Sequence, residues 1–292
     1  MPMRTVWLPI CMIAALSAAA ARGADRAEPG GPLRPNVLMI AVDDLRPLLG
    51  CYGDAIVRSP NIDRLADRGV LFTRAYCQQA VCGQSRASLL CGLRPDTLKQ
   101  AGMGRHFRTV VPDVVTLPQQ FKTHGYFTCA MGKVFHGAFP RSPSPAPVAF
   151  LPMDDPPSWS VPTFRAGPRY YYTPKGIEIA RQVFPRQARR EPGDPDDWTR
   201  YFVRGLATEA PDVPDEVPYD GQIATHAVQT LEKLKQQGQP FFMAVGFIKP
   251  HLPFVAPKRY WELYDRSSLP AAVNPQPPRA APKLALDRKS VV

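Results

Sequence analysis

Apolar runs alternate with amphipathic segments along most of the chain. Four short runs rich in apolar residues predict strands; they span 36–42, 70–76, 126–131 and 241–248. The first run is almost unbroken, which suits a strand covered on both faces as in a parallel sheet. Apolar residues at helical spacing, with Gly, Ser or Pro near the ends, predict helices over 61–68, 85–91, 116–123 and 219–237. This alternation predicts an α/β fold with a mixed, mostly parallel sheet and helices on both faces.

Two parts of the chain depart from this alternation. The stretch of about 138–218 shows little periodicity and is rich in proline, so we expect a proline-rich insertion there. At the N-terminus, Arg4 precedes an apolar run and the small residues 18–21, which is the plan of a secretory signal peptide over 1–24. The run is too short for a stable membrane span, so the sequence predicts an exported protein.

The charge and the cysteines narrow the expected partners and compartment. A formal net charge of +11 favours polyanionic partners, whether nucleic acid, anionic lipid or sulfated polymer. The sequence has no basic run with interleaved aromatics, no helix-turn-helix pattern and no zinc spacing, so we expect no nucleic-acid partner. Cys11 lies in the expected signal peptide, and the other cysteines are either buried thiols or disulfides. The sequence does not predict an oligomeric state.

Two neighbouring carboxylates follow the first predicted strand. Asp43 and Asp44 come directly after 36–42, at the strand end where ligands collect in open α/β sheets. Like charges this close need a cation or strong hydrogen-bond donors to stay ionised. Oxygen ligands suit Ca²⁺ or Mg²⁺, and the alternative is an ordinary turn or helix cap.

Two other strand ends each carry a lysine and a histidine. Lys133 and His136 follow the strand predicted at 126–131, and Lys249 and His251 follow the one at 241–248. Cationic donors at one edge of a sheet are suited to binding an oxyanion. A single histidine of this kind is more often structural, but two such pairs favour an oxyanion site.

Several motifs together resemble the type I, formylglycine-dependent sulfatases. They are Asp43-Asp44, S-P-N-I-D-R-L-A-D-R-G-V-L-F-T-R-A-Y (59–76), C-G-Q-S-R-A-S-L-L-C-G (82–92), G-K-V-F-H (132–136) and F-F-M-A-V-G-F-I-K-P-H-L-P-F (241–254). Their order and spacing are most similar to the iduronate-2-sulfatase branch, over about 35–264. The resemblance implies an alkaline-phosphatase-like fold, of which 25–286 would be an incomplete N-terminal catalytic domain.

The resemblance also implies a nucleophile made from Cys82. A formylglycine-generating or equivalent modifying enzyme would oxidise this cysteine to an aldehyde. One hydroxyl of the hydrated aldehyde would attack sulfur, and the other would expel sulfate. Asp43, Asp44 and modified Cys82 would bind the divalent cation, which we expect to be Ca²⁺, with Mg²⁺ as the alternative.

Four further residues take roles from the same resemblance. Arg86 would hold the formylglycine, and Lys133 and His251 would bind sulfate oxygens. His136 would contact the formylglycine hydroxyl and act as the base for sulfate expulsion. The implied substrate is a sulfate ester of a sugar, a uronate or another unit of a sulfated polysaccharide.

The chain departs from the family pattern at two places. Gln84 stands where the modification motif C-x-P-S-R has proline, which would weaken conversion of Cys82. Residues 287–292 match the translation of a sequencing adapter, and the expected downstream metal ligands are absent from the sequence after Leu269. We therefore expect a C-terminally truncated fragment that is inactive as it stands.

Two alternatives stay open at this point. The first is a phosphatase, phosphodiesterase or phosphonate hydrolase on the same scaffold, although those enzymes commonly place Thr or Ser at the position of Cys82. The second is a non-catalytic protein that binds sulfated polysaccharide, which the positive charge and Gln84 permit.

Overall fold

The computed structural model describes residues 34–99, 106–136, 154–166, 171–188, 205–271, 276 and 279–281. The expected signal peptide and the expected adapter-derived residues lie outside the described residues, as does part of the expected proline-rich insertion. Residues from Pro35 onward form a compact unit of their own, and the description below concerns that unit.

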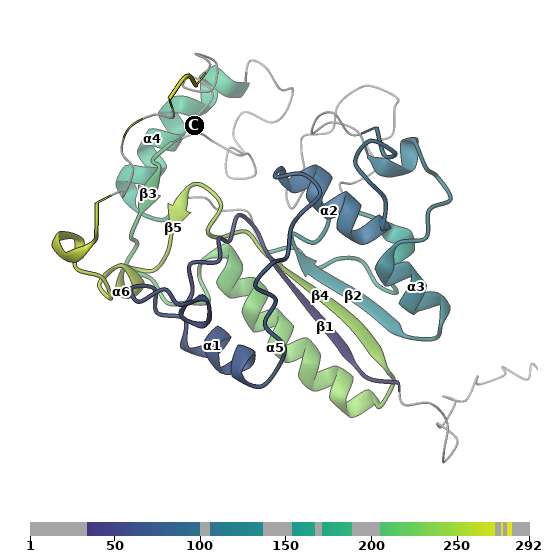
Figure 1. Ribbon diagram of the computed structural model, residues 1–292. Coiled ribbons are helices and arrows are strands. Elements are labelled where there is room, and N and C mark those ends of the chain that lie inside the picture. The colour runs from purple at the N-terminus through teal and green to yellow at the C-terminus, as the bar shows by residue number, and fades with distance from the viewer. Residues whose placement is uncertain are drawn as a thin grey trace, which may run out of the picture. The chain divides into compact units, whose positions relative to one another are not determined.

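A three-stranded parallel sheet forms the centre of this unit. Its strands are β1 (Val37–Val42), β4 (Phe241–Phe247) and β2 (Phe127–Gly132), in that order across the sheet (Figure 1). Val42 pairs with Phe247 and Gly132 pairs with Gly246, so all three strands end at the same edge. Three of the predicted strands are thereby confirmed, and their carboxyl ends lie together.

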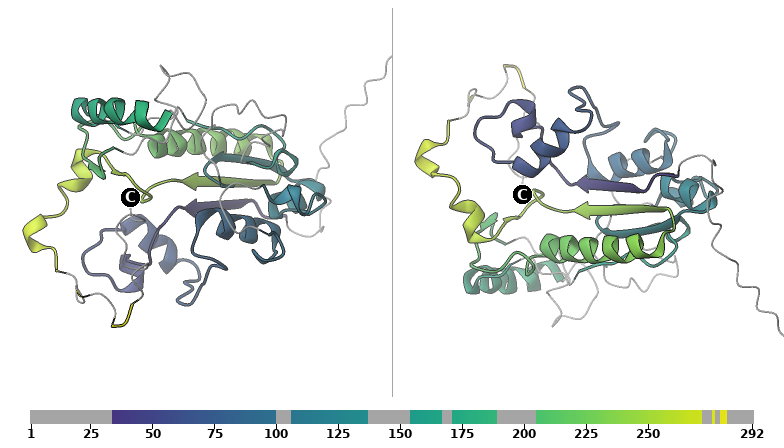
Figure 2. Two further views of the ribbon diagram at one scale, coloured as in Figure 1. Left: turned by 90° about the horizontal axis from the view of Figure 1, so that it is seen from above. Right: turned by 90° about the horizontal axis from the view of Figure 1, so that it is seen from below.

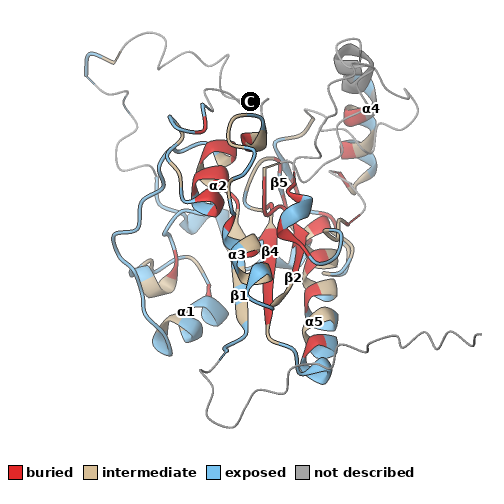
Figure 3. Ribbon diagram, turned by 90° about the vertical axis from the view of Figure 1, so that its right-hand side faces the viewer, coloured by how far each residue is buried: buried red, intermediate tan, exposed pale blue. Residues whose placement is uncertain are grey.

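Helices cover both faces of the sheet, as predicted (Figure 2). On one face, α5 (Tyr219–Gln237) packs against β4 and β2; on the other lie α2 (Cys82–Cys91) and α3 (Leu117–Thr123). Side chains alternate along β4, so Met243 belongs to the core under α5 and Phe242 to the core under α2 and α3. Figure 3 shows β4 buried along its length between these layers.

The remaining elements lie around this sandwich. A second parallel pair, β3 (Thr208–Glu209) and β5 (Phe254–Val255), lies beside the carboxyl edge of the main sheet (Figure 1). The other α-helices are α1 (Pro60–Asp67), α4 (Pro174–Ala188) and α6 (Lys258–Trp261). Short 3₁₀ turns occupy Gly50–Tyr52, Phe107–Thr109, Pro156–Ser158 and Arg266–Ser268.

Two expectations about elements are wrong, and the proline-rich stretch holds a helix that its weak periodicity did not predict. Residues 70–76 form no strand; Phe72 is exposed, and no strand of the described chain lies beside this segment to complete a ladder. The expected insertion contains a helix, α4, although proline surrounds it. Helix α2 begins at Cys82 rather than Ser85, because packing of its buried face outweighs the low helix propensity of Gly83.

The part of the chain that the structure describes holds no disulfide and no helix suited to crossing a membrane. Its cysteines are all free thiols, namely Cys51, Cys77, Cys82, Cys91 and Cys129. Burial raises the pKa of Cys91 to about 12 and that of Cys129 to about 11, so both are protonated apolar core residues. Among the described helices, none combines the length and apolar character needed to cross a membrane.

Candidate active site

The first element of the site is the turn that follows β1. Asp43 continues the ladder, since its N–H donates to the Phe247 carbonyl over 3.0 Å, and its side chain is buried. Asp44 takes a left-handed backbone with φ of 59°, which Asp tolerates better than most residues, and its side chain is exposed. The two neighbouring carboxylates therefore point into different surroundings.

Arg86 ties helix α2 to two strand ends. It lies one turn after Cys82, is buried, and donates to the Lys133 carbonyl and, over 2.9 Å, to the Val134 carbonyl. Its Nη2 lies 3.1 Å from Asp43 Oδ1. A guanidinium with several donors in a fixed fork can hold these partners at once, so Arg86 fixes α2 against β1 and β2.

Lys133 completes a buried group of three charges at the same edge. Its Nζ donates to Asp43 Oδ2, so Asp43 is bound by two cations. Burial alone would raise the pKa of Asp43, but the hydrogen bond and charge of Lys133 and the charge of Arg86 lower it below its ordinary value. Asp43 is therefore ionised at neutral pH.

A glycine on β4 makes room for the Lys133 backbone. A Cβ at Gly246 would lie 1.9 Å from the Lys133 carbonyl oxygen, closer than any side chain can approach. The Lys133 N–H donates to the Gly246 carbonyl over 2.9 Å, which places the turn after β2 directly on the end of β4. Only glycine allows this crossing, and the crossing aims Lys133 at Asp43.

Cys82 and His136 form a second pair beside these charges. Cys82 is the first residue of α2, and its Sγ lies 3.3 Å from His136 Nδ1. The turn after β2 thus delivers both Lys133 and His136, while α2 delivers both Cys82 and Arg86. Two short segments therefore supply four of the expected site residues.

His251 lies in the loop after β4 and faces Asp44. Its Nε2 is 3.9 Å from Asp44 Oδ2, and its Nδ1 is 2.8 Å from the Leu252 carbonyl oxygen. A carbonyl only accepts hydrogen bonds, so Nδ1 carries a proton in this arrangement, and Nε2 is the nitrogen that faces Asp44.

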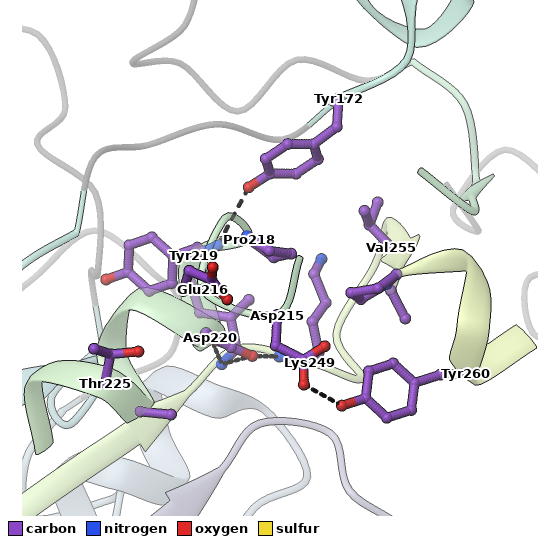
Figure 4. Close-up of a pocket in the computed structure, with 15 residues that line it drawn as sticks. Tyr172, Asp215, Glu216, Pro218, Tyr219, Asp220, Thr225, Lys249, Val255 and Tyr260 are labelled. Atoms are coloured by element: carbon purple, nitrogen blue, oxygen red, sulfur yellow. Dashed lines mark hydrogen bonds between the residues drawn. The ribbon is translucent and has the colours of Figure 1, made fainter. Parts of the chain in front are cut away.

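A cavity of about 400 Å³ lies behind the His251 loop, between the start of α5, the end of β4, β5 and α6 (Figure 4). Its lining includes Tyr172, Asp215, Glu216, Asp220, Lys249 and Tyr260. Burial raises the pKa of Asp220, against hydrogen bonds from the Ile248 and Lys249 backbone, and burial lowers the pKa of Lys249 to about 8.

The expected metal ligands are of the type that a hard cation prefers, but they are too few to complete its coordination sphere. Asp43 and Asp44 offer carboxylate oxygens, whereas Ca²⁺ takes about six to eight oxygen ligands. No group of three or more His, Cys, Asp or Glu side chains suited to a metal ion occurs among the described residues. The structure does not gather Asp43, Asp44 and Cys82 into one such group.

The site residues expected from the sequence thus fall into linked clusters. One joins Asp43, Arg86 and Lys133, another joins Cys82 and His136, and a third brings His251 near Asp44. Sequence reasoning missed Asp220, because an acidic residue in the first turn of a helix is ordinary. It also grouped Lys249 with the oxyanion donors, and the structure turns that side chain toward loop carbonyls instead.

Comparisons with known proteins by family, by sequence and by structure give related results. The sulfatase family model matches residues 35–281. The human iduronate 2-sulfatase is 39% identical over 86% of this chain and 41% of its own length, and a sulfatase of Formosa agariphila is 31% identical over 81% and 43%. The phosphonate monoester hydrolase of Agrobacterium radiobacter superposes with a TM-score of 0.58 and 25% identity, over 82% of this chain and 46% of that one. The chain therefore spans less than half the length of these relatives, and the shared fold is alkaline-phosphatase-like.

Proposed function

Since the chain belongs to the sulfatase family, we propose that it forms part of a sulfuric ester hydrolase that removes sulfate from a sugar. The observation that supports this most directly is the position of Cys82, at the start of α2 and 3.3 Å from His136 Nδ1, beside a cluster of buried cations. A nucleophile next to a base and to cationic donors is the arrangement that sulfuryl transfer requires.

Cys82 is the residue that would be converted to formylglycine by a modifying enzyme. When formed, the hydrated aldehyde supplies a hydroxyl that attacks sulfur, which an unmodified thiol does not. His136, whose Nδ1 faces the position of the present Sγ, would accept the proton of the remaining hydroxyl, so that the aldehyde re-forms as sulfate leaves. Arg86 would keep the start of α2 in place through its bonds to the strand ends.

Lys133 and His251 would bind the sulfate oxygens, on which negative charge grows in the transition state. The Lys133 ammonium is paired with Asp43, so binding sulfate requires another counter-charge for that carboxylate. A divalent cation, Ca²⁺ or Mg²⁺, held in part by Asp43 and Asp44 would supply that counter-charge and polarise the sulfuryl group. His251 would donate to a sulfate oxygen from Nε2, the nitrogen that faces Asp44.

The substrate class, export and partners belong to the same proposal. The name of the human relative supports a sulfated uronic acid, and the net charge of +11 favours a sulfated polymer. The expected signal peptide supports export. The proposed partner is a modifying enzyme that would act on Cys82 before the chain has folded. We propose no nucleic-acid partner.

The test is sulfate release by the full-length protein from an aryl sulfate, beside phosphate release from the matching aryl phosphate. We expect faster turnover of the sulfate, loss of activity in Cys82→Ala, and a formylglycine-containing Cys82 peptide by mass spectrometry. Chelation should abolish turnover, and Ca²⁺ should restore it. Faster turnover of the phosphate would favour a hydrolase of the phosphonate-ester type, in line with the structural similarity at 25% identity.

A further inference from the structure

We propose that Asp220 and Lys249 are positioning residues that hold the loop carrying His251 in place, Asp220 from the first turn of α5 and Lys249 from within the loop itself. The inference rests on the proposed function for the role of His251, but its geometry is independent of that role. Neither side chain belongs to the clusters around Asp43 and Cys82, and both line the cavity behind the loop (Figure 4).

Asp220 holds the start of the loop by its backbone. Its carboxylate accepts hydrogen bonds from the Ile248 N–H over 2.9 and 3.1 Å and from the Lys249 N–H over 2.7 Å. These are the first two N–H groups after β4, which have no further ladder to join. A carboxylate in the first turn of α5 thus fixes the point where the chain leaves the sheet.

Lys249 holds the far side of the same loop. Its Nζ donates to the His251 carbonyl over 3.0 Å and to the Pro253 carbonyl. The His251 N–H donates in turn to the Ile248 carbonyl over 2.8 Å, so the loop is closed on itself. An ammonium committed to two loop carbonyls is a structural brace for the residue between them and is not available as a sulfate ligand.

The brace determines which nitrogen of His251 faces the site. The bond from Nδ1 to the Leu252 carbonyl exists only while the loop keeps this shape, and it leaves Nε2 toward Asp44. If Asp220 is replaced by Asn, an NH₂ group takes the place of one carboxylate oxygen. One of the backbone N–H groups of the loop then faces another donor and loses its acceptor. Displacement of a reacting group by about 1 Å costs about 100-fold in rate, so the change should be visible in turnover.

The experiment introduces Asp220→Asn and Lys249→Met separately into the full-length protein and compares each variant with the unchanged parent. Glu216→Gln serves as the matched control. Glu216 lines the same cavity and is exposed, so its substitution removes a charge there without touching the loop. We expect kcat on an aryl sulfate to fall about 10- to 100-fold in both variants, with KM changed less than about threefold, and no change in the control. In ¹⁵N histidine spectra, assigned with His251→Gln, the Nδ1 resonance of His251 should move from its position in the parent protein, because its bond to the Leu252 carbonyl loosens.

Kinetics and spectra separate the possible results. Parent values of kcat and an unchanged His251 resonance in both folded variants would overturn the proposal. If Asp220→Asn fails to fold, Lys249→Met carries the same test, because its backbone contacts with Asp220 remain. If the parent protein releases no sulfate but the variants still shift the His251 resonance, the positioning role stands and the proposed function fails.

Discussion

At the residue scale, the Asp43 carboxylate depends on two buried cations. We expect Lys133→Met to lower the free energy of unfolding by about 3 kcal/mol at neutral pH, since one partner of a buried pair is lost while Arg86 remains. The folded pKa of Asp43 lies below its ordinary value of 3.8, so its contribution to stability is present above that value and is lost as the pH falls through the folded pKa. The difference in the free energy of unfolding between the parent and Lys133→Met should therefore become smaller in acid.

Urea unfolding at about pH 7 and about pH 3 measures this difference. Lys133→Arg keeps the positive charge and serves as the control, for which we expect a smaller deficit. A deficit of equal size at both pH values would mean that Lys133 stabilises the fold by packing and not by its charge.

Lys249 offers a second test at this scale, because burial lowers its pKa to about 8. At about pH 8 roughly half of the Lys249 amine is unprotonated and can react with an amine-acylating reagent added in limiting amount. We expect the labelled fraction of the Lys249 peptide, measured over a series of pH values, to rise up to about pH 8 and to level off above it. Mass spectrometry of the digest gives this fraction, and a yield that keeps rising to about pH 10 would contradict the lowered pKa.

At the element scale, the start of α2 tests the departure from the family motif. Gln84 is the third residue of the helix, where the N–H has no intrahelical acceptor, and its buried Oε1 has no hydrogen-bond partner among the described residues. We therefore expect Gln84→Pro to keep the midpoint of thermal unfolding within about 3 °C and to increase conversion of Cys82. Peptide mass spectrometry measures the converted fraction.

Leu89→Pro is the control for this prediction. Leu89 is exposed and lies in the interior of the same helix, so proline there should cost about 3 kcal/mol through the backbone alone. Equal destabilisation by the two prolines would show that the start of α2 does not tolerate the family residue.

The elements also explain how far the sequence could predict the structure. Apolar runs predicted β2 and β4, because strands buried on both faces need apolar residues at nearly every position, and the same signal predicted β1 although its α5 face is exposed. The same signal was wrong for 70–76, since a run of apolar residues does not say whether a partner strand lies beside it. Strand ends located Asp43, Lys133 and His251, but the bonds of Lys249 and Asp220 depend on loop geometry between distant segments.

At the scale of the whole chain, β1 leaves an apolar surface uncovered. Leu38 and Ile40 lie on the α5 face of the sheet, beside Met243 and Val245, but α5 packs over β4 and β2, so they remain 45% and 52% exposed. Within the described residues β1 pairs with β4 alone, which leaves its other edge without a strand partner. Exposed apolar strands with a free edge favour association between chains.

We therefore expect the 292-residue chain, expressed by itself, to self-associate through β1. Charged residues at Leu38 and Ile40 should oppose strand pairing, so the double variant Leu38→Lys/Ile40→Lys should sediment more slowly than the parent at the same concentration. Leu65→Lys, at an exposed apolar residue of α1, introduces the same kind of charge away from the sheet and should leave the association unchanged. If Leu65→Lys disperses the chain as well as the double variant does, the association arises from apolar surface in general, and the open edge of β1 has no special part in it.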